Sequence, residues 1–164
     1  MLAVCCLLFL SACTPPEKVA AAPKPASEYF PISVGGVTIN LQLAVTDAEM
    51  ERGLMFRRDV GLTQGMLFVY PGPRKVSFWM RNTPTPLEIG YFSGDGILRE
   101  VYSLVPHDER SVSSRREDIQ YALEVRAGWF ETTGVKPGAR LDLRAVASAM
   151  TARGFSLKPY RGLR

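Results

Sequence analysis

From residue 29 onward, apolar and polar positions alternate at the period of a β-strand. Residues 32–45 alternate on both sides of Gly35-Gly36, and two such runs across a Gly-Gly pair predict a β-hairpin. The runs at residues 87–92 and 97–105 flank Gly94-Asp95-Gly96 and predict a second hairpin. Further strands are predicted at residues 66–69, 76–80, 119–125 and 141–146. About eight short strands at this spacing predict a closed or nearly closed barrel.

The polar segments between these runs predict two short helices and a loop. Thr46 and Glu49 have the spacing of a capping box, which predicts a helix that ends near Phe56. Residues 128–133 predict a second short helix, and residues 106–118 predict a polar loop. We therefore predict an α+β fold, mostly β: a compact, partly closed β-barrel-like domain with two short helices.

Residues 1–13 have the pattern of an export signal. Residues 2–10 are wholly apolar, and the small residues Ser11 and Ala12 precede Cys13. Such a run is too short to span a bilayer and is typical of a secretory signal. Its end also resembles the bacterial lipobox, which implies that Cys13 is diacylated and becomes the mature N-terminus. A signal peptide without lipidation is the alternative, since no Lys or Arg precedes the apolar run.

This signal predicts where the protein works. Thr14 follows Cys13, and by resemblance to envelope sorting rules a residue other than Asp favours the outer membrane. We expect a cell-envelope protein that is lipid-anchored through Cys13, faces the periplasm and has the membrane as a partner. The predicted parts are a lipoprotein signal segment at 1–13, a Pro/Ala-rich linker at 14–28, the folded domain at 29–147 and a C-terminal tail at 148–164.

The composition excludes several kinds of chemistry. Cys5, Cys6 and Cys13 are the only cysteines, so the folded part has no disulfide, thiol nucleophile or thiolate metal site. His107 is the one histidine, which excludes a zinc site of the usual His/Cys type. The net charge of +4 comes without a basic stripe interleaved with aromatic residues, so we expect no nucleic-acid partner. No Gly-rich phosphate loop is present, and we expect no cofactor.

Five segments, in a fixed order, resemble one protein family. They are residues 51–57 (ERGLMFR), 65–68 (GMLF), 78–83 (FWMRNT), 86–89 (PLEI) and 123–129 (LEVRAGW). Together they are similar to the domain of unknown function 192 (DUF192) family, over about residues 34–143. The resemblance implies a compact β-barrel-like α+β domain, often exported, with no settled biochemical activity. Family members more often carry Lys where Arg81 stands and Asp where Glu88 stands, and both differences keep the charge.

Aromatic and hydrogen-bonding side chains within these segments predict a recognition site. The ligand-binding candidates are Arg52, Trp79, Asn82, Glu124 and Trp129. Their mixture suits an envelope small molecule, a glycan or a protein. The alternative is that some are core residues, because Phe78 and Trp79 are neighbours on a strand and point in opposite directions. We favour a non-catalytic ligand-binding or accessory module, and we assign no catalytic residue.

One enzymatic alternative is a carboxylate-dependent hydrolase that acts on an envelope substrate. Glu88 and Glu124 both lie in apolar strands, and a facing pair would work as acid and base. The structural interpretation is that each of these carboxylates forms an ion pair with an arginine, and we favour it. The arginines considered for this role are Arg52, Arg57 and Arg81.

Two weaker alternatives involve a soft metal or a nucleophile. Met55, Met66 and Met80 would suit Cu(I), but methionine also fills irregular cores. His107 and Asp108 have serines nearby, but adjacent residues in a polar loop seldom hold the geometry of a triad. We therefore interpret them as solvated loop residues.

Overall fold

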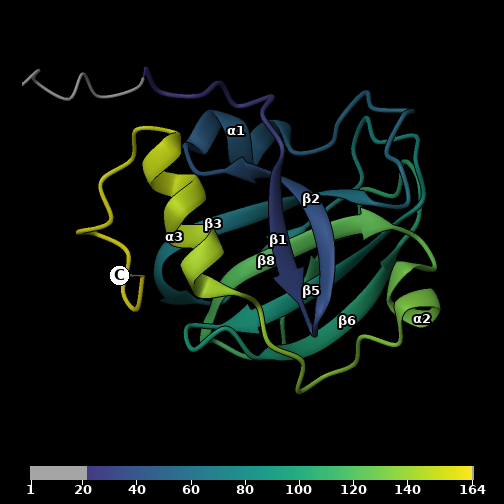
Figure 1. Ribbon diagram of the computed structural model, residues 1–164. Helices are drawn as coiled ribbons and strands as arrows, with labels where there is room; N and C mark the ends of the chain where they lie inside the picture. Colours follow the sequence, from purple (N-terminus) through teal and green to yellow (C-terminus); the bar gives the residue numbers. More distant parts are fainter. Residues whose placement is uncertain (1–21, 164) are drawn as a thin grey trace, which may run out of the picture.

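The computed structural model describes residues 22–163, which form a curved sheet with three helices around it (Figure 1). The predicted signal segment with Cys13, and residues 14–21 of the predicted linker, lie outside the described residues. Within residues 22–163, no helix is both long and apolar enough to cross a bilayer.

Six strands form one mixed sheet, and two more form a small second sheet. In spatial order the six strands are β1 (Phe30–Val34), β2 (Val37–Ala44), β3 (Gln64–Arg74), β8 (Ile119–Arg126), β5 (Leu87–Ser93) and β6 (Leu98–Leu104). Only β2 and β3 pair in parallel, because helix α1 (Asp47–Arg52) lies between them in the chain. The second sheet pairs β4 (Ser77–Phe78) with β7 (Val112–Ser113), which belongs to the predicted polar loop.

Both predicted hairpins are confirmed. Gly35 and Gly36 connect β1 to β2 with φ angles of 59° and 86°, the left-handed values that a two-residue turn of this kind requires. The turn between β5 and β6 closes where the Ser93 N–H donates to the Ile97 carbonyl at 3.0 Å. Local turn chemistry therefore sets the register of both pairs.

The large sheet is not closed, although a short segment connects its two edges. The Gly35 N–H at the end of β1 donates to the Arg140 carbonyl, and the Leu98 N–H of β6 donates to the Ala139 carbonyl, both at 2.8 Å. The mostly-β α+β class is confirmed. A fully closed barrel is not formed, because residues 138–142, rather than a pairing of β1 with β6, span the gap at one end of the sheet.

The strands predicted at 66–69 and 76–80 have different bounds in the structure. The first is part of the longer β3, which continues through Pro71-Gly72-Pro73 with a register shift between Val69 and Arg74. The second is reduced to the two residues of β4. This irregularity brings the second half of β3 over the face on which the candidate site lies.

The described residues form three helices, one more than predicted: α1, α2 (Trp129–Thr133) and α3 (Leu143–Ala152). The capping box is confirmed, since Thr46 accepts from the Glu49 N–H while the Glu49 side chain accepts from the Thr46 N–H. The strand predicted at 141–146 is wrong. Asp142 accepts from the N–H groups of Arg144 and Ala145 and so begins α3 as its N-cap.

The C-terminal residues belong to the same core as the sheet. The boundary that we predicted after residue 147 falls inside α3, and Met150 of this helix is fully buried. Tyr160 and Leu163 are buried in the same cluster. The Lys24 N–H, in the predicted linker, donates to the Ala152 carbonyl at 2.9 Å, so both flanking segments contact the end of α3.

Alternation along the central strands divides the core between the two faces of the sheet. On β8, Leu123 and Val125 face the cluster that α3 covers, whereas Ala122 and Glu124 face the other side. That second cluster contains Phe68 of β3 and is covered by α1 and the small β4–β7 sheet rather than by a long helix. The candidate site lies on this thinly covered face.

Candidate functional site

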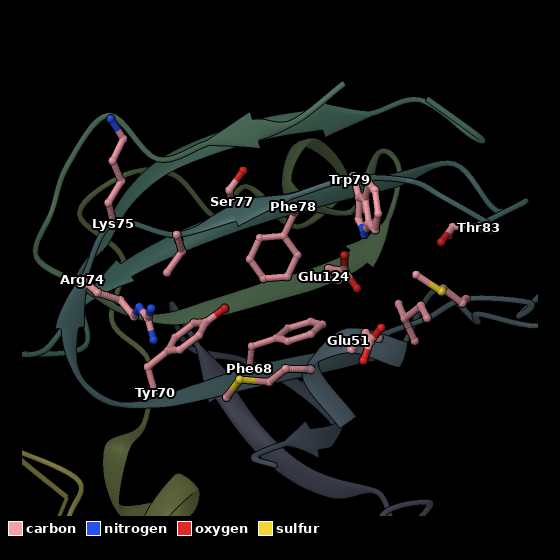
Figure 2. A pocket seen from close by; sticks show the side chains of 15 residues that line it. Glu51, Phe68, Tyr70, Arg74, Lys75, Ser77, Phe78, Trp79, Thr83 and Glu124 are labelled. Atoms are coloured by element: carbon pink, nitrogen blue, oxygen red, sulfur yellow. The ribbon is translucent and has the colours of Figure 1, made fainter. Parts of the chain in front are cut away.

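A cavity of about 470 Å³ lies between α1, the second half of β3, β4 and β8 (Figure 2). Its apolar walls are formed by Met50, Leu54, Met55, Phe68, Val76, Phe78 and Trp79. Its polar lining consists of Glu51, Tyr70, Arg74, Lys75, Ser77, Thr83 and Glu124. A volume of this size, with apolar and aromatic walls and polar groups among them, is typical of small-molecule sites.

Glu124 lies at the floor of this cavity because of its register in β8. It pairs with Met66 of β3 and with Ile89 of β5, so its side chain shares their face of the sheet. The residue is only 5% exposed, and neither of its carboxylate oxygens makes a hydrogen bond or ion pair within residues 22–163. Burial raises the pKa of the Glu124 carboxyl to about 8, so the group is mostly protonated at neutral pH.

Gly53 keeps the space beside Glu124 open. It ends α1 with φ 44° and ψ −131°, a backbone conformation that residues other than glycine rarely adopt. A Cβ here would lie 3.3 Å from the Phe68 ring and 3.7 Å from a carboxylate oxygen of Glu124. The glycine therefore lets the end of the helix approach the cavity floor.

Aromatic rings form the walls on either side of the carboxyl. Phe68 and Phe78 pack edge to face, with centroids 4.8 Å apart, and Phe78 is also 6.1 Å from Tyr91. Trp79 is 42% exposed and stands at one end of the cavity, where the Arg81 guanidinium lies 5.5 Å from its ring centroid. Both Phe78 and Trp79 therefore line the cavity, the first as a wall and the second at the mouth.

The opposite end carries a tyrosine and two cations. In Figure 2 the Tyr70 hydroxyl points into the cavity, with Arg74 beside it and Lys75 extending outward. The Arg74 guanidinium lies 5.6 Å from the Tyr70 ring centroid. Burial raises the pKa of Tyr70 to about 12, so its hydroxyl keeps its proton and acts as a donor.

A second, more open hollow of about 500 Å³ adjoins the cavity. It is lined by Ala48, Glu51, Arg52, Met55, Trp79, Arg81 and Asn82, of which Glu51, Met55 and Trp79 also line the cavity. Of the five predicted site residues, Arg52, Trp79, Asn82 and Glu124 therefore lie in two adjoining hollows. Trp129 lies elsewhere: it is 4% exposed and packs against Phe130 in the core that α3 covers.

The carboxylate pair that we considered for a hydrolase is not formed. Glu88 of β5 pairs with Val125 of β8, one position from Glu124, so the two carboxylates lie on opposite faces of the sheet. Glu88 instead accepts a hydrogen bond from the Phe130 N–H at 3.2 Å.

The ion-pair interpretation of Glu124 is also wrong for the arginines that we named. Arg57 bonds Asp59 and Tyr29, and Arg81 lies over Trp79. Arg52 is exposed and lines only the outer hollow of the two. The carboxyl therefore stays without a charged partner within residues 22–163.

The other candidate chemistry has a structural explanation. Met66 and Met80 are buried in the second core cluster, and Met55 lines the cavity. Residues 22–163 contain no cluster of three His, Cys, Asp or Glu side chains that would hold a metal ion. His107 is exposed, and Asp108 is bound by the Arg110 guanidinium rather than by the imidazole.

Most residues that line the cavity are not among the ligand-binding candidates predicted from the sequence. Phe68 and Tyr70 were detectable, because alternation along β3 places them on the face of Met66. Arg74 and Lys75 were not, since their position depends on the irregular register after Val69.

The fold and these hollows define a small α+β domain with a ligand-sized cavity on one face of an open sheet. The chain belongs to the DUF192 family, whose model, described as "Uncharacterized ACR", matches residues 30–143. The comparison with curated proteins gives no match.

Two solved structures are similar to this chain. A protein of unknown function from Novosphingobium aromaticivorans DSM 12444 is 33% identical, with a TM-score of 0.67, over 76% of this chain and 94% of its own. A protein from Sinorhizobium meliloti 1021, described as a candidate transcription regulator, is 37% identical, with a TM-score of 0.64, over 70% of this chain and 95% of its own. The similarity therefore covers most of the described domain.

Proposed function

We propose that this protein is a non-catalytic ligand-binding module. Its cavity accepts a small organic molecule that has an apolar body and a hydrogen-bond acceptor facing Glu124. One observation carries the proposal: the carboxyl group of Glu124, a residue that is only 5% exposed, opens on an aromatic cavity of about 470 Å³ and has no hydrogen-bond or ion-pair partner within residues 22–163. Buried polar groups in folded proteins nearly always have a partner, and a ligand would supply the missing one.

Binding fits this arrangement better than catalysis. General acid–base chemistry on a glycoside needs two carboxylates that converge on one bond, and Glu88 is on the other face of the sheet. Glu51 is the other carboxylate of the cavity, and it is exposed at the mouth. The single histidine lies on a different loop, and the aspartate beside it is already bound by an arginine. A nucleophile with its base is therefore not assembled within residues 22–163.

We also propose that this module acts in the cell envelope as a lipoprotein anchored through Cys13, in the outer membrane and facing the periplasm. The support is the apolar run at residues 2–10, the small residues before Cys13 and the Pro/Ala-rich segment that follows. Mass spectrometry of the native protein tests this. We expect a mature chain that begins at an acylated Cys13, and a Cys13→Ser variant that leaves the membrane fraction. An unprocessed chain with Met1 intact would refute the anchor without affecting the cavity.

A fragment screen by saturation-transfer NMR tests ligand binding. It compares the wild type with Glu124→Leu, which removes the buried polar group, and with Glu131→Gln, which neutralises an exposed carboxylate on α2. We expect a set of fragments that bind the wild type and Glu131→Gln alike and lose about tenfold or more in affinity with Glu124→Leu.

Two results would contradict the proposal. One is that no fragment binds, or that binding is the same in all three proteins. The other is that Glu124→Leu unfolds the domain, because Glu124 would then be a structural residue. We expect the opposite, since replacing an unpaired buried polar group with an apolar one of similar size is neutral or stabilising.

A further inference from the structure

We propose that the ligand of this cavity is an organic anion, a carboxylate carried on an aromatic or acyl body. This inference rests on the proposed function and narrows the chemical class of the ligand. Three features of the lining carry it: Glu124, Tyr70 and Trp79 offer hydrogen-bond donors, the charges around the cavity are mainly positive, and two of the aromatic rings each have a cation of the protein beside them.

The first feature is the hydrogen-bonding character of the lining. Glu124 is protonated at neutral pH because burial raises its pKa to about 8, so it presents an O–H. The Tyr70 hydroxyl and the indole N–H of Trp79 point into the space in front of it (Figure 2). A tyrosine hydroxyl and a carboxylic acid can donate, and an indole N–H can only donate. A ligand that bonds to these groups must therefore present hydrogen-bond acceptors.

The second feature is the charge around the cavity and the adjoining hollow. Arg74 and Lys75 stand at one end of the cavity, and Arg52 and Arg81 line the adjoining hollow. None of these four side chains forms a salt bridge within residues 22–163, and Glu51 is the one carboxylate that lines both hollows. This excess of positive charge around the two hollows attracts anions and repels cations.

The third feature distinguishes this cavity from an aromatic box for ammonium ligands, which also combines aromatic rings with a buried carboxyl. In such a box the ring faces are free to receive the cation. Here the Arg74 guanidinium lies 5.6 Å from the Tyr70 centroid, and the Arg81 guanidinium lies 5.5 Å from the Trp79 centroid. Two of the aromatic rings of the cavity therefore already have a cation of the protein over one face, and these guanidinium groups disfavour a second cation beside them.

The proposal predicts that the affinity for the anion falls as the pH rises. The ionisable groups that face Glu124 are Glu51 from α1, Tyr70 and Arg74 from β3, Tyr91 from β5 and Lys75 from the segment before β4. The two tyrosines keep their protons below about pH 10, because burial raises the pKa of both. Glu124 is therefore the group that changes charge between about pH 7 and pH 9. Its ionisation removes a donor and places a negative charge beside the ligand.

The experiment titrates the full-length protein with three probes that share one body: phenylacetate, the neutral phenylacetamide and the cationic 2-phenylethylamine. Calorimetry at about pH 7 and about pH 9 is expected to rank phenylacetate first and to show about tenfold weaker phenylacetate binding at the higher pH. Glu124→Gln removes the ionisable group and is expected to abolish this pH dependence. Lys75→Gln is expected to weaken phenylacetate binding several-fold, whereas Lys136→Gln, at an exposed lysine away from the cavity, leaves it unchanged.

The outcomes separate the two proposals. If 2-phenylethylamine binds best and gains affinity with rising pH, or if the neutral amide binds best, the anion proposal is wrong and the cavity still binds ligands. If phenylacetate binding keeps its pH dependence in Glu124→Gln, or ignores Lys75→Gln, the anion binds elsewhere and the proposal is overturned. If none of the three probes binds, the anion proposal fails, and the fragment screen decides separately whether the cavity binds ligands.

Discussion

Replacing Glu124 by glutamine is expected to change how the stability of the protein depends on pH. The wild-type carboxyl is buried without a partner within residues 22–163, and burial raises its pKa from the ordinary 4.5 to about 8. Glutamine keeps the shape and polarity of the side chain but does not titrate. The comparison of the two proteins therefore isolates the contribution of this one proton.

The sign and size follow from the two pKa values. Between about pH 4.5 and pH 8 the folded protein holds the Glu124 proton and the unfolded chain does not, so the free energy of unfolding falls as the pH rises. The contribution of this proton to stability is complete below the pKa of Glu124 in the unfolded chain, and it is lost progressively as the pH rises to the pKa in the folded protein. A difference of about 3.5 pKa units corresponds to about 5 kcal/mol in total. Between pH 5 and pH 8, about 3 to 4 kcal/mol of this is lost.

Urea denaturation between about pH 5 and pH 8 measures this difference. We expect the free energy of unfolding of Glu124→Gln, minus that of the wild type, to increase by about 3 to 4 kcal/mol over this range. Other carboxylates, such as Asp108 with its pKa lowered to about 2 by the Arg110 guanidinium, are common to both proteins and cancel. Glu131→Gln should follow the wild type. Parallel curves, with a difference constant to about 1 kcal/mol, would show that Glu124 titrates normally and would refute the burial argument.

Three further substitutions test the local structure. Gly53→Ala is expected to cost about 2 kcal/mol, because alanine is strained at this positive φ and its Cβ meets Phe68; unchanged urea stability would contradict this. Arg153→Met, which leaves Glu49 without its buried partner, should cost about 3 kcal/mol, while Arg144→Met on the exposed side of α3 should change little. Thr46→Ala should cost about 1 kcal/mol by removing the capping box, and equal melting temperatures would argue against that contribution.

Local signals in the sequence predict the elements that depend on a few neighbouring residues. The turn at Gly35-Gly36 and the capping box of Thr46 and Glu49 are formed as expected, because backbone conformation and hydrogen bonds within four residues decide them. The segment at 141–146 shows the limit of this reasoning. Its alternation favours a strand, yet one side chain, that of Asp142, accepts two backbone hydrogen bonds and begins a helix instead.

Closure of the barrel and the cavity lining depend on contacts between distant residues. Residues 138–142 bond to both edge strands, but nothing in their own composition indicates that they bridge a gap. Arg74 reaches the cavity because β3 shifts register after Val69, and Phe78 reaches it because β4 pairs with β7. Such pairings join residues more than thirty positions apart, so a periodicity within one segment does not predict them.

Glu124 is an acidic residue in a strand whose pattern is otherwise that of a buried core strand, and this exception points to its role. All residues of β8 from Ile119 to Val125 are buried, and apart from Glu124 and Gln120 they have apolar or aromatic side chains. An ion pair would reconcile a carboxylate with this strand, but no arginine or lysine provides one within residues 22–163. The unpaired group costs about 5 kcal/mol at alkaline pH, which is comparable to the whole stability of a small domain. A residue that opposes folding to this extent, beside an open cavity, is best explained by what it binds.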